Sequence, residues 1–330
     1  MTANKYKAGV IGCGFGEQHI QWIKECGSQI DIAWIGYRSN RKHALEIAKK
    51  HKIKKVTDDA ENMLCEVDFI VIVTPVFLHY PLAKSSILQK KSVVCDKPLA
   101  MNSQEALSLV DLARQHNVSH MVLFQWRFNK HLNVLKKVIE QGLLGNIHLI
   151  QGEFFHDFIL ANGKTWRHDP LASGSGAFGD MGVHLIDCIQ WLMNDRIQVD
   201  FVNKKVIYNP TIKDKQYSQS TEDYGMISFS LKNKNVGGVL SVCRTAKGYH
   251  FIRMVVVGEK GTAVFEMNPS TNQGSLRFLG ITVPALIMED FPENPYYHWL
   301  SHLENKTAVP NFEDGALAQQ VMDEIVNYGK

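Results

Sequence analysis

The chain has 330 residues, of which 45% are hydrophobic and 21% are charged, and its formal net charge is +3. These values are typical of a soluble globular protein and allow two domains, each with its own core. The basic residues are dispersed, so the sequence gives no indication of a nucleic-acid-binding surface. No apolar run has the length of a membrane span and residues 1–12 include no apolar signal region, so we expect a cytoplasmic protein.

The first part of the chain alternates between strand and helix patterns. Apolar runs such as 67–75 are typical of parallel strands buried on both faces. Ser103 is the expected N-cap of the last helix. The alternation predicts an α/β domain, a Rossmann-type doubly wound parallel sheet, over residues 1–125. We expect strands at 6–12, 30–36, 67–75, 91–98 and 118–124, and helices at 17–26, 40–51, 79–90 and 103–116.

The pattern changes near residue 125. A helix at 129–141 and a long strand at 147–157 are followed by a helix at 180–193, and then by several strands between 197 and 280. These later strands alternate polar and apolar residues, which indicates an antiparallel sheet with one face covered. We therefore predict an α+β domain over residues 126–330. The boundary is set by the change of pattern, because no flexible linker is evident.

Six cysteines are present, and their spacing shows no paired pattern. Most lie in apolar strands or helices, so we expect buried, reduced thiols, as in a cytosolic protein. They are Cys13, Cys26, Cys65, Cys95, Cys188 and Cys243.

The segment "VIGCGFGEQH" connects the first strand to the first helix. Gly12 and Gly14 lie where a dinucleotide diphosphate would contact a helix N-terminus, with Phe15 beside them. The usual third glycine would be at position 17, which is glutamate here; Gly16 supplies it one residue early. We interpret the segment as a cofactor-binding turn. The alternative is a tight strand-to-helix turn that binds nothing.

The end of the second strand indicates which dinucleotide is preferred. A carboxylate at this position would bind the adenosine ribose hydroxyls, but "YRSNRK" offers Arg38, Ser39 and Arg41 instead. A guanidinium attracts a 2′-phosphate and a hydroxyl can donate to it. We therefore expect NADP(H) to be favoured over NAD(H). The alternative is that the arginines only solvate a loop.

The stretch "GDMGVHLIDCIQWL", residues 179–192, combines a helical pattern with an unusual polar stripe. Asp180, His184 and Asp187 have i, i+4 and i+7 spacing and project from one face, while the other positions are largely apolar. Such a stripe could ligate a divalent ion, but no second cluster with ligand spacing is evident, so we predict no metal. "HWLSH" at 298–302 lacks the glutamate of a zinc protease motif and is expected to be a surface helix.

Several segments together resemble the Gfo/Idh/MocA oxidoreductase family, which includes glucose-fructose oxidoreductase and inositol dehydrogenases. The resemblance covers nearly the whole chain, and two departures stand out. Asp96 replaces the more usual glutamate, and the glycine turn is compact. The matching segments are "CDKPLA" (95–100), "VTPVFLHYPLA" (73–83), "WRFN" (126–129), "WRHDP" (166–170) and "GSGAFGDMGVHLID" (174–187).

The resemblance implies an N-terminal Rossmann domain and a C-terminal domain with a large open antiparallel sheet, often used for homodimer or homotetramer contacts. It also implies NAD(P)-dependent oxidation of a sugar or cyclitol hydroxyl, or the reverse reduction. The implied catalytic group is Lys97, Asp180 and His184, which with Asn129 would contact the substrate. The implied cofactor neighbours are Thr74, Pro75, His79, Asp96, Lys97, Pro98, Arg127, Trp166 and Arg167.

The chemistry accounts for these residue types. Removing a hydride from an alcohol carbon requires that the hydroxyl proton leave, so a base or a positive charge must stabilise the oxygen. His184 can accept a proton near neutral pH, and Lys97 can stabilise the oxyanion or relay the proton. Asp180 can orient the imidazole or bind a second hydroxyl. We expect the polar stripe to face a cleft between the domains, and leave open whether Lys97 or His184 is the proton acceptor.

Other functions are compatible with the same fold. One is an NADP-dependent dihydrodiol dehydrogenase or a reductase of nonsugar carbonyls. Another is a non-enzymatic regulator that binds the dinucleotide, although such a protein need not keep Lys97, Asp180 and His184 together. Further candidates for the pocket are Tyr80, Phe155 and His156, and three glycines (Gly174, Gly176 and Gly179) are expected to permit close approach of the loop before the helix.

Overall fold

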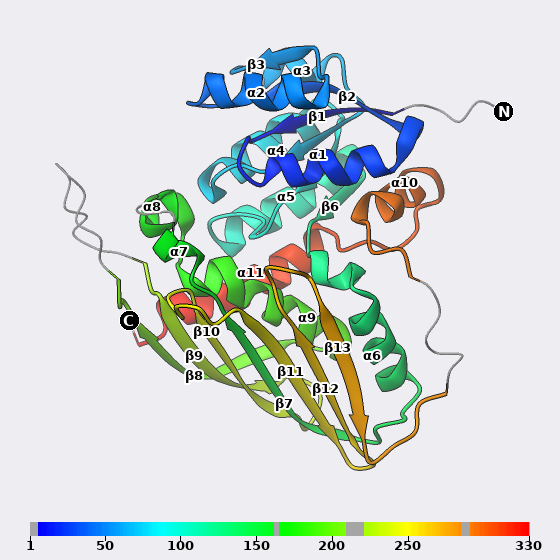
Figure 1. Ribbon diagram of the computed structural model, residues 1–330, viewed down its shortest axis with the longest axis vertical. Coiled ribbons are helices and arrows are strands. Elements are labelled where there is room, and N and C mark those ends of the chain that lie inside the picture. Colours follow the sequence, from blue (N-terminus) through cyan, green and yellow to red (C-terminus); the bar gives the residue numbers. More distant parts are fainter. Residues whose placement is uncertain (1–5, 162–164, 209–220, 285–290, 330) are drawn as a thin grey trace. The chain divides into compact units, whose positions relative to one another are not determined.

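The computed structural model describes residues 6–161, 165–208, 221–284 and 291–329. The chain divides into two compact units, the first formed by Met1–Phe124 with Asn294–Ala316, and the second by Gln125–Glu293 with Leu317–Lys330 (Figure 1). We predicted a single boundary near residue 125, whereas residues 294–316 belong to the first unit. The expectation that residues 1–12 include no signal region falls partly on residues 1–5, which lie outside the described residues.

The first unit contains a six-stranded sheet in the order β3-β2-β1-β4-β5-β6. Every neighbouring pair in it is parallel, which confirms the predicted Rossmann-type sheet. Strand β3 was not predicted, because three residues are too few to show a period. The strands are β1 (Tyr6–Ile11), β2 (Ile30–Gly36), β3 (Lys55–Thr57), β4 (Phe69–Ile72), β5 (Ser92–Cys95) and β6 (His120–Val122).

The helices of the first unit correct two expectations. The N-cap of α5 is Asn102 rather than Ser103, because the Asn102 side chain accepts from the Glu105 N–H. The "HWLSH" segment lies in α10 and is not a surface helix, since Trp299 is fully buried against Phe69. The helices are α1 (Gly16–Glu25), α2 (Arg41–His51), α3 (Glu61–Leu64), α4 (His79–Leu88), α5 (Ser103–His116) and α10 (Pro295–Asn305).

The second unit contains a seven-stranded sheet in the order β13-β12-β11-β7-β10-β9-β8. Its neighbours are antiparallel, as predicted, except for β7 and β10, which pair in parallel. Alternation of polar and apolar residues predicts a half-covered strand but not the direction of its neighbour. The strands are β7 (Ile147–Phe155), β8 (Ile197–Lys205), β9 (Tyr224–Leu231), β10 (Gly237–Cys243), β11 (Phe251–Gly258), β12 (Thr262–Met267) and β13 (Gly274–Leu279).

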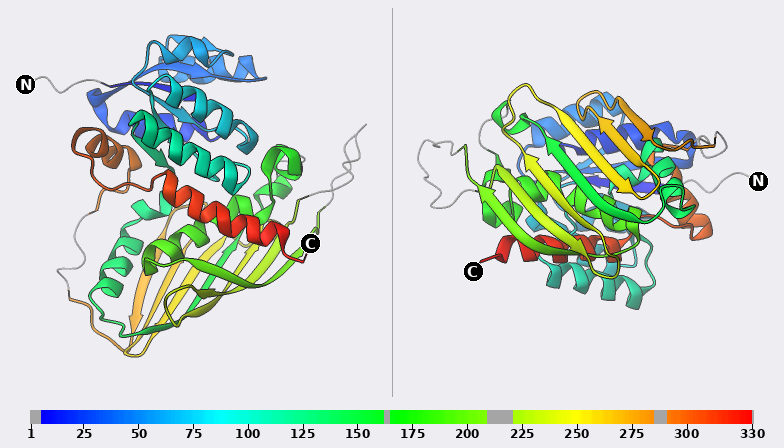
Figure 2. Two further views of the ribbon diagram at one scale, coloured as in Figure 1. Left: turned by 180° about the vertical axis from the view of Figure 1, so that it is seen from behind. Right: turned by 90° about the horizontal axis from the view of Figure 1, so that it is seen from below.

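Helices cover one face of this sheet (Figure 2). They are α6 (Lys130–Glu140), α9 (Val183–Met193) and the part of α11 (Phe312–Asn327) that belongs to the second unit. Short helices α7 (Phe158–Ala161) and α8 (Pro170–Ser173) lie in the segment before α9. The right panel of Figure 2 views the opposite face, which no helix of the described residues covers. No described helix is both long and apolar enough to cross a membrane.

The cysteines fit the expectation only in part. All six are free thiols, and Cys26, Cys95 and Cys188 are buried. However, two others are half-buried and Cys65 is exposed, because it directly follows the short helix α3.

Two adjacent glycines of β10 test the close packing at the centre of this sheet. A Cβ atom at Gly238 would lie 2.3 Å from the Ile150 carbonyl oxygen and 2.4 Å from the Phe229 ring, whereas at Gly237 its nearest neighbour would be 3.8 Å away. We expect Gly238→Ala to lower the free energy of unfolding by about 1–3 kcal/mol through overpacking. The control Gly237→Ala should change it by less than about 1 kcal/mol. Urea unfolding followed by circular dichroism measures both, and equal effects would contradict this account.

Candidate active site

The glycine turn of the first unit has one glycine that the chain itself requires. Gly12 has a φ of +116°, and a Cβ atom there would lie 2.2 Å from the Val73 carbonyl oxygen. Its N–H donates to the Gly36 carbonyl oxygen at 2.9 Å. The turn therefore closes on the ends of β2 and β4, and no side chain fits at Gly12.

The other glycines of the turn fit a bound dinucleotide. Among the described residues, no heavy atom beyond its chain neighbours lies within 4 Å of the place where a Cβ atom on Gly14 would sit. The protein's own packing thus gives no reason for a glycine there. Gly16 begins α1, and a Cβ atom on it would lie 3.5 Å from the Val10 side chain. No described side chain caps the helix at Phe15. An uncapped helix N-terminus beside an open glycine suits a diphosphate.

The end of β2 carries exposed cations, as expected. Arg38, Ser39 and Arg41 are all exposed, and Asn40 caps α2 by accepting from the His43 N–H. The Arg38 guanidinium lies 4.8 Å from the centre of the Phe77 ring, a cation–π contact between the ends of β2 and β4. This contact holds the charged group at the carboxyl edge of the sheet.

His79 ties together two loops at the same edge. It is 1% exposed. Its ring nitrogens lie 2.7 Å from the Pro98 carbonyl oxygen and 2.9 Å from that of Thr74. Burial lowers the pKa of His79, and the nearby Asp96 opposes this shift. We infer that His79 positions the segments around Thr74 and Lys97 through the main chain.

The loop that His79 holds also presents a buried hydroxyl. The Oγ1 atom of Thr74 is buried and has no hydrogen-bond partner among the described residues. Pro75, the next residue, is half-buried. An orphaned hydroxyl at the carboxyl end of β4 fits a polar ligand at the place where a nicotinamide is expected.

Lys97 follows β5 at the same edge of the sheet. It is half-buried, and its main-chain N–H donates to the Asp96 carboxylate at 2.8 Å. The Lys97–Pro98 peptide bond is cis. The Asp96 side chain therefore holds the main chain of Lys97.

In the second unit, the polar stripe lies on two kinds of helix. Residues Phe178–Gly182 form a π-helical turn, which leads directly into α9. The continuous α-helix expected over 180–193 is thus corrected, and the wider π turn changes the angular spacing of its side chains. Single π turns are frequent at functional sites.

The three stripe residues have different surroundings. His184 is 5% exposed and stacks on Trp126, with ring centres 5.1 Å apart. Asp180 accepts from Arg167 Nε at 3.1 Å, and the Arg244 guanidinium lies 3.9 Å from its other oxygen. Asp187 is 2% exposed. The stripe is therefore divided between a stacked imidazole and separately paired carboxylates.

Arg127 and Asn129 are engaged within the second unit. Arg127 makes two hydrogen bonds to the Asp187 carboxylate, at 3.0 and 2.6 Å. Asn129 caps α6 by accepting from the N–H groups of His131 and Leu132. Both contacts give these residues a structural role beside the cofactor and substrate roles predicted for them.

The loop before the π turn places Arg167 between an aromatic ring and a carboxylate. The Arg167 guanidinium lies 4.5 Å from the centre of the Trp166 ring, and its Nε reaches Asp180. Thr165 caps this short turn through the Arg167 N–H. The loop thus brings two predicted cofactor neighbours to a predicted catalytic carboxylate.

Sequence reasoning missed the residues that support this arrangement. Arg244 and Asp223 are fully buried and form an ion pair at 2.8 Å. Arg244 also donates to the carbonyl oxygens of Arg167 and Thr221. The one available signal is that Arg244 interrupts an apolar strand pattern at the end of β10, since a buried charge needs partners.

Among the described residues, one cluster has the composition of a metal site, formed by His156, Asp157 and His250. The two imidazole rings are stacked 4.1 Å apart with planes only 7° from parallel, so their in-plane lone pairs do not converge on one point. His156 Nδ1 accepts the N–H groups of Asp157 and Phe158, and His250 Nε2 lies 2.6 Å from the Asp157 carboxylate. These contacts indicate a hydrogen-bonded network.

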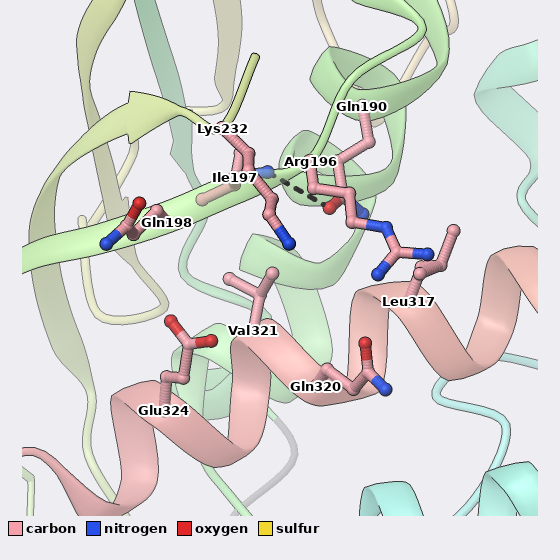
Figure 3. A pocket seen from close by; sticks show the side chains of 9 residues that line it. All are labelled: Gln190, Arg196, Ile197, Gln198, Lys232, Leu317, Gln320, Val321 and Glu324. Atoms are coloured by element: carbon pink, nitrogen blue, oxygen red, sulfur yellow. Dashed lines mark hydrogen bonds between the residues drawn. The ribbon is translucent and has the colours of Figure 1, made fainter.

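A pocket of about 310 Å³ lies at another place in the second unit (Figure 3). It is lined by residues of α9, β8, the turn between β9 and β10, and α11. Figure 3 shows Arg196 and Lys232 on one side and Glu324 on α11, with a hydrogen bond from the Ile197 N–H to Gln190. None of its lining residues is a predicted site residue, and none is a histidine.

Comparisons with known proteins agree with this architecture. Residues 6–124 match the model of an oxidoreductase family with an NAD-binding Rossmann fold, and residues 132–264 match the GFO/IDH/MocA C-terminal domain. The chain is 29% identical to glucose-6-phosphate 3-dehydrogenase of Bacillus subtilis, over 96% of this chain and 94% of that protein. It is 23% identical to myo-inositol 2-dehydrogenase of Thermotoga maritima, over 77% and 73% of the two chains.

A solved structure shows the same fold. Levoglucosan dehydrogenase in complex with NADH and levoglucosan aligns with a TM-score of 0.82 and 22% identity, over 98% of this chain and 96% of that one. With both family models matched in order along one chain, the protein belongs to the GFO/IDH/MocA family of NAD-binding oxidoreductases.

Proposed function

We propose that the protein is an NADP(H)-preferring dehydrogenase or reductase that acts on a CH–OH or carbonyl carbon of a sugar, cyclitol or sugar derivative. The observation that carries the proposal is the helix start at 178–187, which fixes Asp180 against Arg167 and stacks His184 on Trp126. The named activities of two relatives, on glucose 6-phosphate and on myo-inositol, support this substrate class. We also propose a cytoplasmic location, which the unpaired spacing of the cysteines supports.

The first unit would hold the dinucleotide. The open side of Gly14, the uncapped start of α1 and the Thr74 hydroxyl fit its diphosphate and nicotinamide portions. When bound, the nicotinamide donates or accepts the hydride. The protein's own task is then to move one proton and to stabilise charge on one oxygen.

Lys97 and His184 are suited to these two tasks. An ammonium group stabilises the negative charge that develops on the reacting oxygen, and an imidazole exchanges a proton near neutral pH. The stacking of His184 on Trp126 fixes the plane of its ring. The carboxylate of Asp180, held by Arg167, is suited to accept a hydrogen bond from a second substrate hydroxyl.

Substitution of the two proton-handling residues tests the catalytic assignment. We expect Lys97→Ala and His184→Ala each to lower kcat about 10²- to 10⁴-fold, because general acid–base and charge stabilisation are lost. The cofactor Kd should change little. Steady-state kinetics and titration of reduced-nicotinamide fluorescence measure the two quantities.

The controls for this experiment are Lys49→Ala and His43→Ala, which change an exposed and a half-buried residue of α2. A panel of sugars, polyols, dihydrodiols and nonsugar carbonyls separates the substrate classes. Dinucleotide binding without turnover on the whole panel would favour a regulator instead of an enzyme. Full activity in either catalytic variant would contradict the assigned roles.

The preference for NADP(H) rests on the exposed cations after β2. Arg38 is held at the carboxyl edge of the sheet by Phe77, with the Ser39 hydroxyl beside it. We expect Arg38→Ala to weaken NADPH binding about 10- to 100-fold, because charge-assisted hydrogen bonds to the 2′-phosphate are lost, and to leave NADH binding within about 3-fold. Fluorescence titration of both cofactors measures this.

Arg114→Ala is the matched control, since it removes an exposed arginine from α5 of the same unit. Tighter binding of NADH than of NADPH by the wild type, unaffected by Arg38→Ala, would refute the phosphate-binding role of Arg38. The oxidoreductase assignment would stand in that case.

The uncovered face of the second unit's sheet supports a homodimer or homotetramer. Val239 and Val255 lie on this face on either side of Gln151, and all three occupy one row of the sheet. Large apolar patches are rare on monomers. We expect light scattering to show an oligomer, and Val255→Arg to halve its mass at micromolar concentration by placing a charge in the contact.

Leu45→Arg is the control for this prediction, because it adds the same charge at an exposed leucine of α2. A monomeric wild type, or an oligomer that tolerates Val255→Arg, would count against contact through this face.

A further inference from the structure

The start of the helical segment that carries Asp180 and His184 is held by one side chain outside it. The Glu222 carboxylate oxygen Oε1 accepts from the N–H of Gly176 at 2.8 Å and from the N–H of Phe178 at 3.1 Å. The Glu222 carbonyl oxygen accepts from Ala177 at 2.8 Å. One residue therefore binds three consecutive N–H groups at the start of the segment.

The segment packs closely against residues 222–225. A Cβ atom on Gly176 would lie 1.9 Å from the Glu222 carbonyl oxygen, so only glycine permits the approach. Phe178 is fully buried, and a Cβ atom on Gly225 would lie 2.1 Å from its ring. Residues 222–225 therefore contact residues 176–178 through both main-chain and side-chain atoms.

The contact extends directly to the polar residues. The Asp180 N–H donates to the Gly176 carbonyl oxygen at 3.0 Å, so the place of Gly176 sets the place of Asp180. The neighbours of Glu222 hold the partner of that carboxylate, because the Thr221 hydroxyl and the Arg244 guanidinium both donate to the Arg167 carbonyl oxygen. Asp180 is therefore held through Gly176 by Glu222, and Arg167 is held by Thr221 and Arg244. Arg244 is in turn paired with Asp223.

The charge of Glu222 suits this role. N–H groups at a helix start carry a partial positive charge, and a carboxylate is the strongest acceptor that a side chain can offer them. Burial raises the pKa of Glu222, while hydrogen bonds from its own main chain and from Gly176 and Phe178, together with the charge of Arg244, oppose that shift. These hydrogen bonds of Glu222 go to main-chain N–H groups and not to the side chains of Asp180 or His184, so its effect passes through the main chain.

We propose that Glu222 is a positioning residue, which fixes the start of the 176–187 segment and thereby sets the turnover rate of the reaction that Asp180 and His184 serve. The inference rests on the proposed function for its effect on rate. Its effect on the segment itself is independent of that function.

The test compares Glu222→Ala, Glu222→Gln and the exposed control Glu140→Ala of α6. We expect Glu222→Ala to lower kcat about 10- to 100-fold, since a displacement of about 1 Å costs this much, with the cofactor Kd unchanged. Glu222→Gln keeps an oxygen acceptor and should restore kcat to within about 5-fold of wild type. Hydrogen exchange measured on peptides covering 174–186 should be faster in Glu222→Ala only.

The outcomes separate the two proposals. Unchanged exchange at 174–186 in Glu222→Ala, or a loss of activity no larger than the unfolded fraction seen by circular dichroism, overturns the positioning role. If Glu222→Ala does not fold, Glu222→Gln and Glu222→Asp decide it, because the shortened acid should lose rate and protection while the amide keeps both. A wild type that turns over no substrate defeats the proposed function, and the exchange data still decide whether Glu222 holds the segment.

Discussion

The second unit depends on one fully buried guanidinium. Removing the Arg244 guanidinium from water costs free energy. This cost is offset because each of its three nitrogens donates a hydrogen bond. Asp223 supplies the countercharge, and the carbonyl oxygens of Thr221 and Arg167 take further donors. Because a buried arginine without these partners would be unstable, the guanidinium holds Asp223, Thr221 and Arg167 at fixed positions around it. The loop of Arg167 and the strand that follows Glu222 are joined in this way.

The two units contribute different chemistry. In the first unit, the groups that we propose to face the ligand are main-chain N–H groups, an open glycine and a buried hydroxyl at the carboxyl ends of parallel strands. In the second, they are charged and aromatic side chains held by ion pairs and stacking. A dinucleotide diphosphate suits the former, and proton transfer and hydroxyl recognition need the latter.

Features set by residues close together in the sequence could be predicted, whereas contacts between distant residues could not. The parallel sheet and its helices were predictable, because hydrophobic period and turn residues are local signals. The pairing of Asp187 with Arg127, 60 positions away, was not predictable from such signals. The Ser103 cap was misplaced by one residue because Asn102 is an equally good acceptor. The parallel pairing of β7 with β10 depends on strand order, which no local pattern reports.

By itself, the sequence determined the Rossmann-type domain and the glycine turn, since both are written in residue type and spacing. It also carried the family resemblance, which implies Lys97, Asp180 and His184 as the catalytic group. The tertiary structure alone decided which carboxylates of the polar stripe are paired, that a π turn precedes α9, and that Glu222 and Arg244 support it. The physical reason is that burial of a charge or of a helix start is stable only with specific partners, and the fold brings those partners from distant positions.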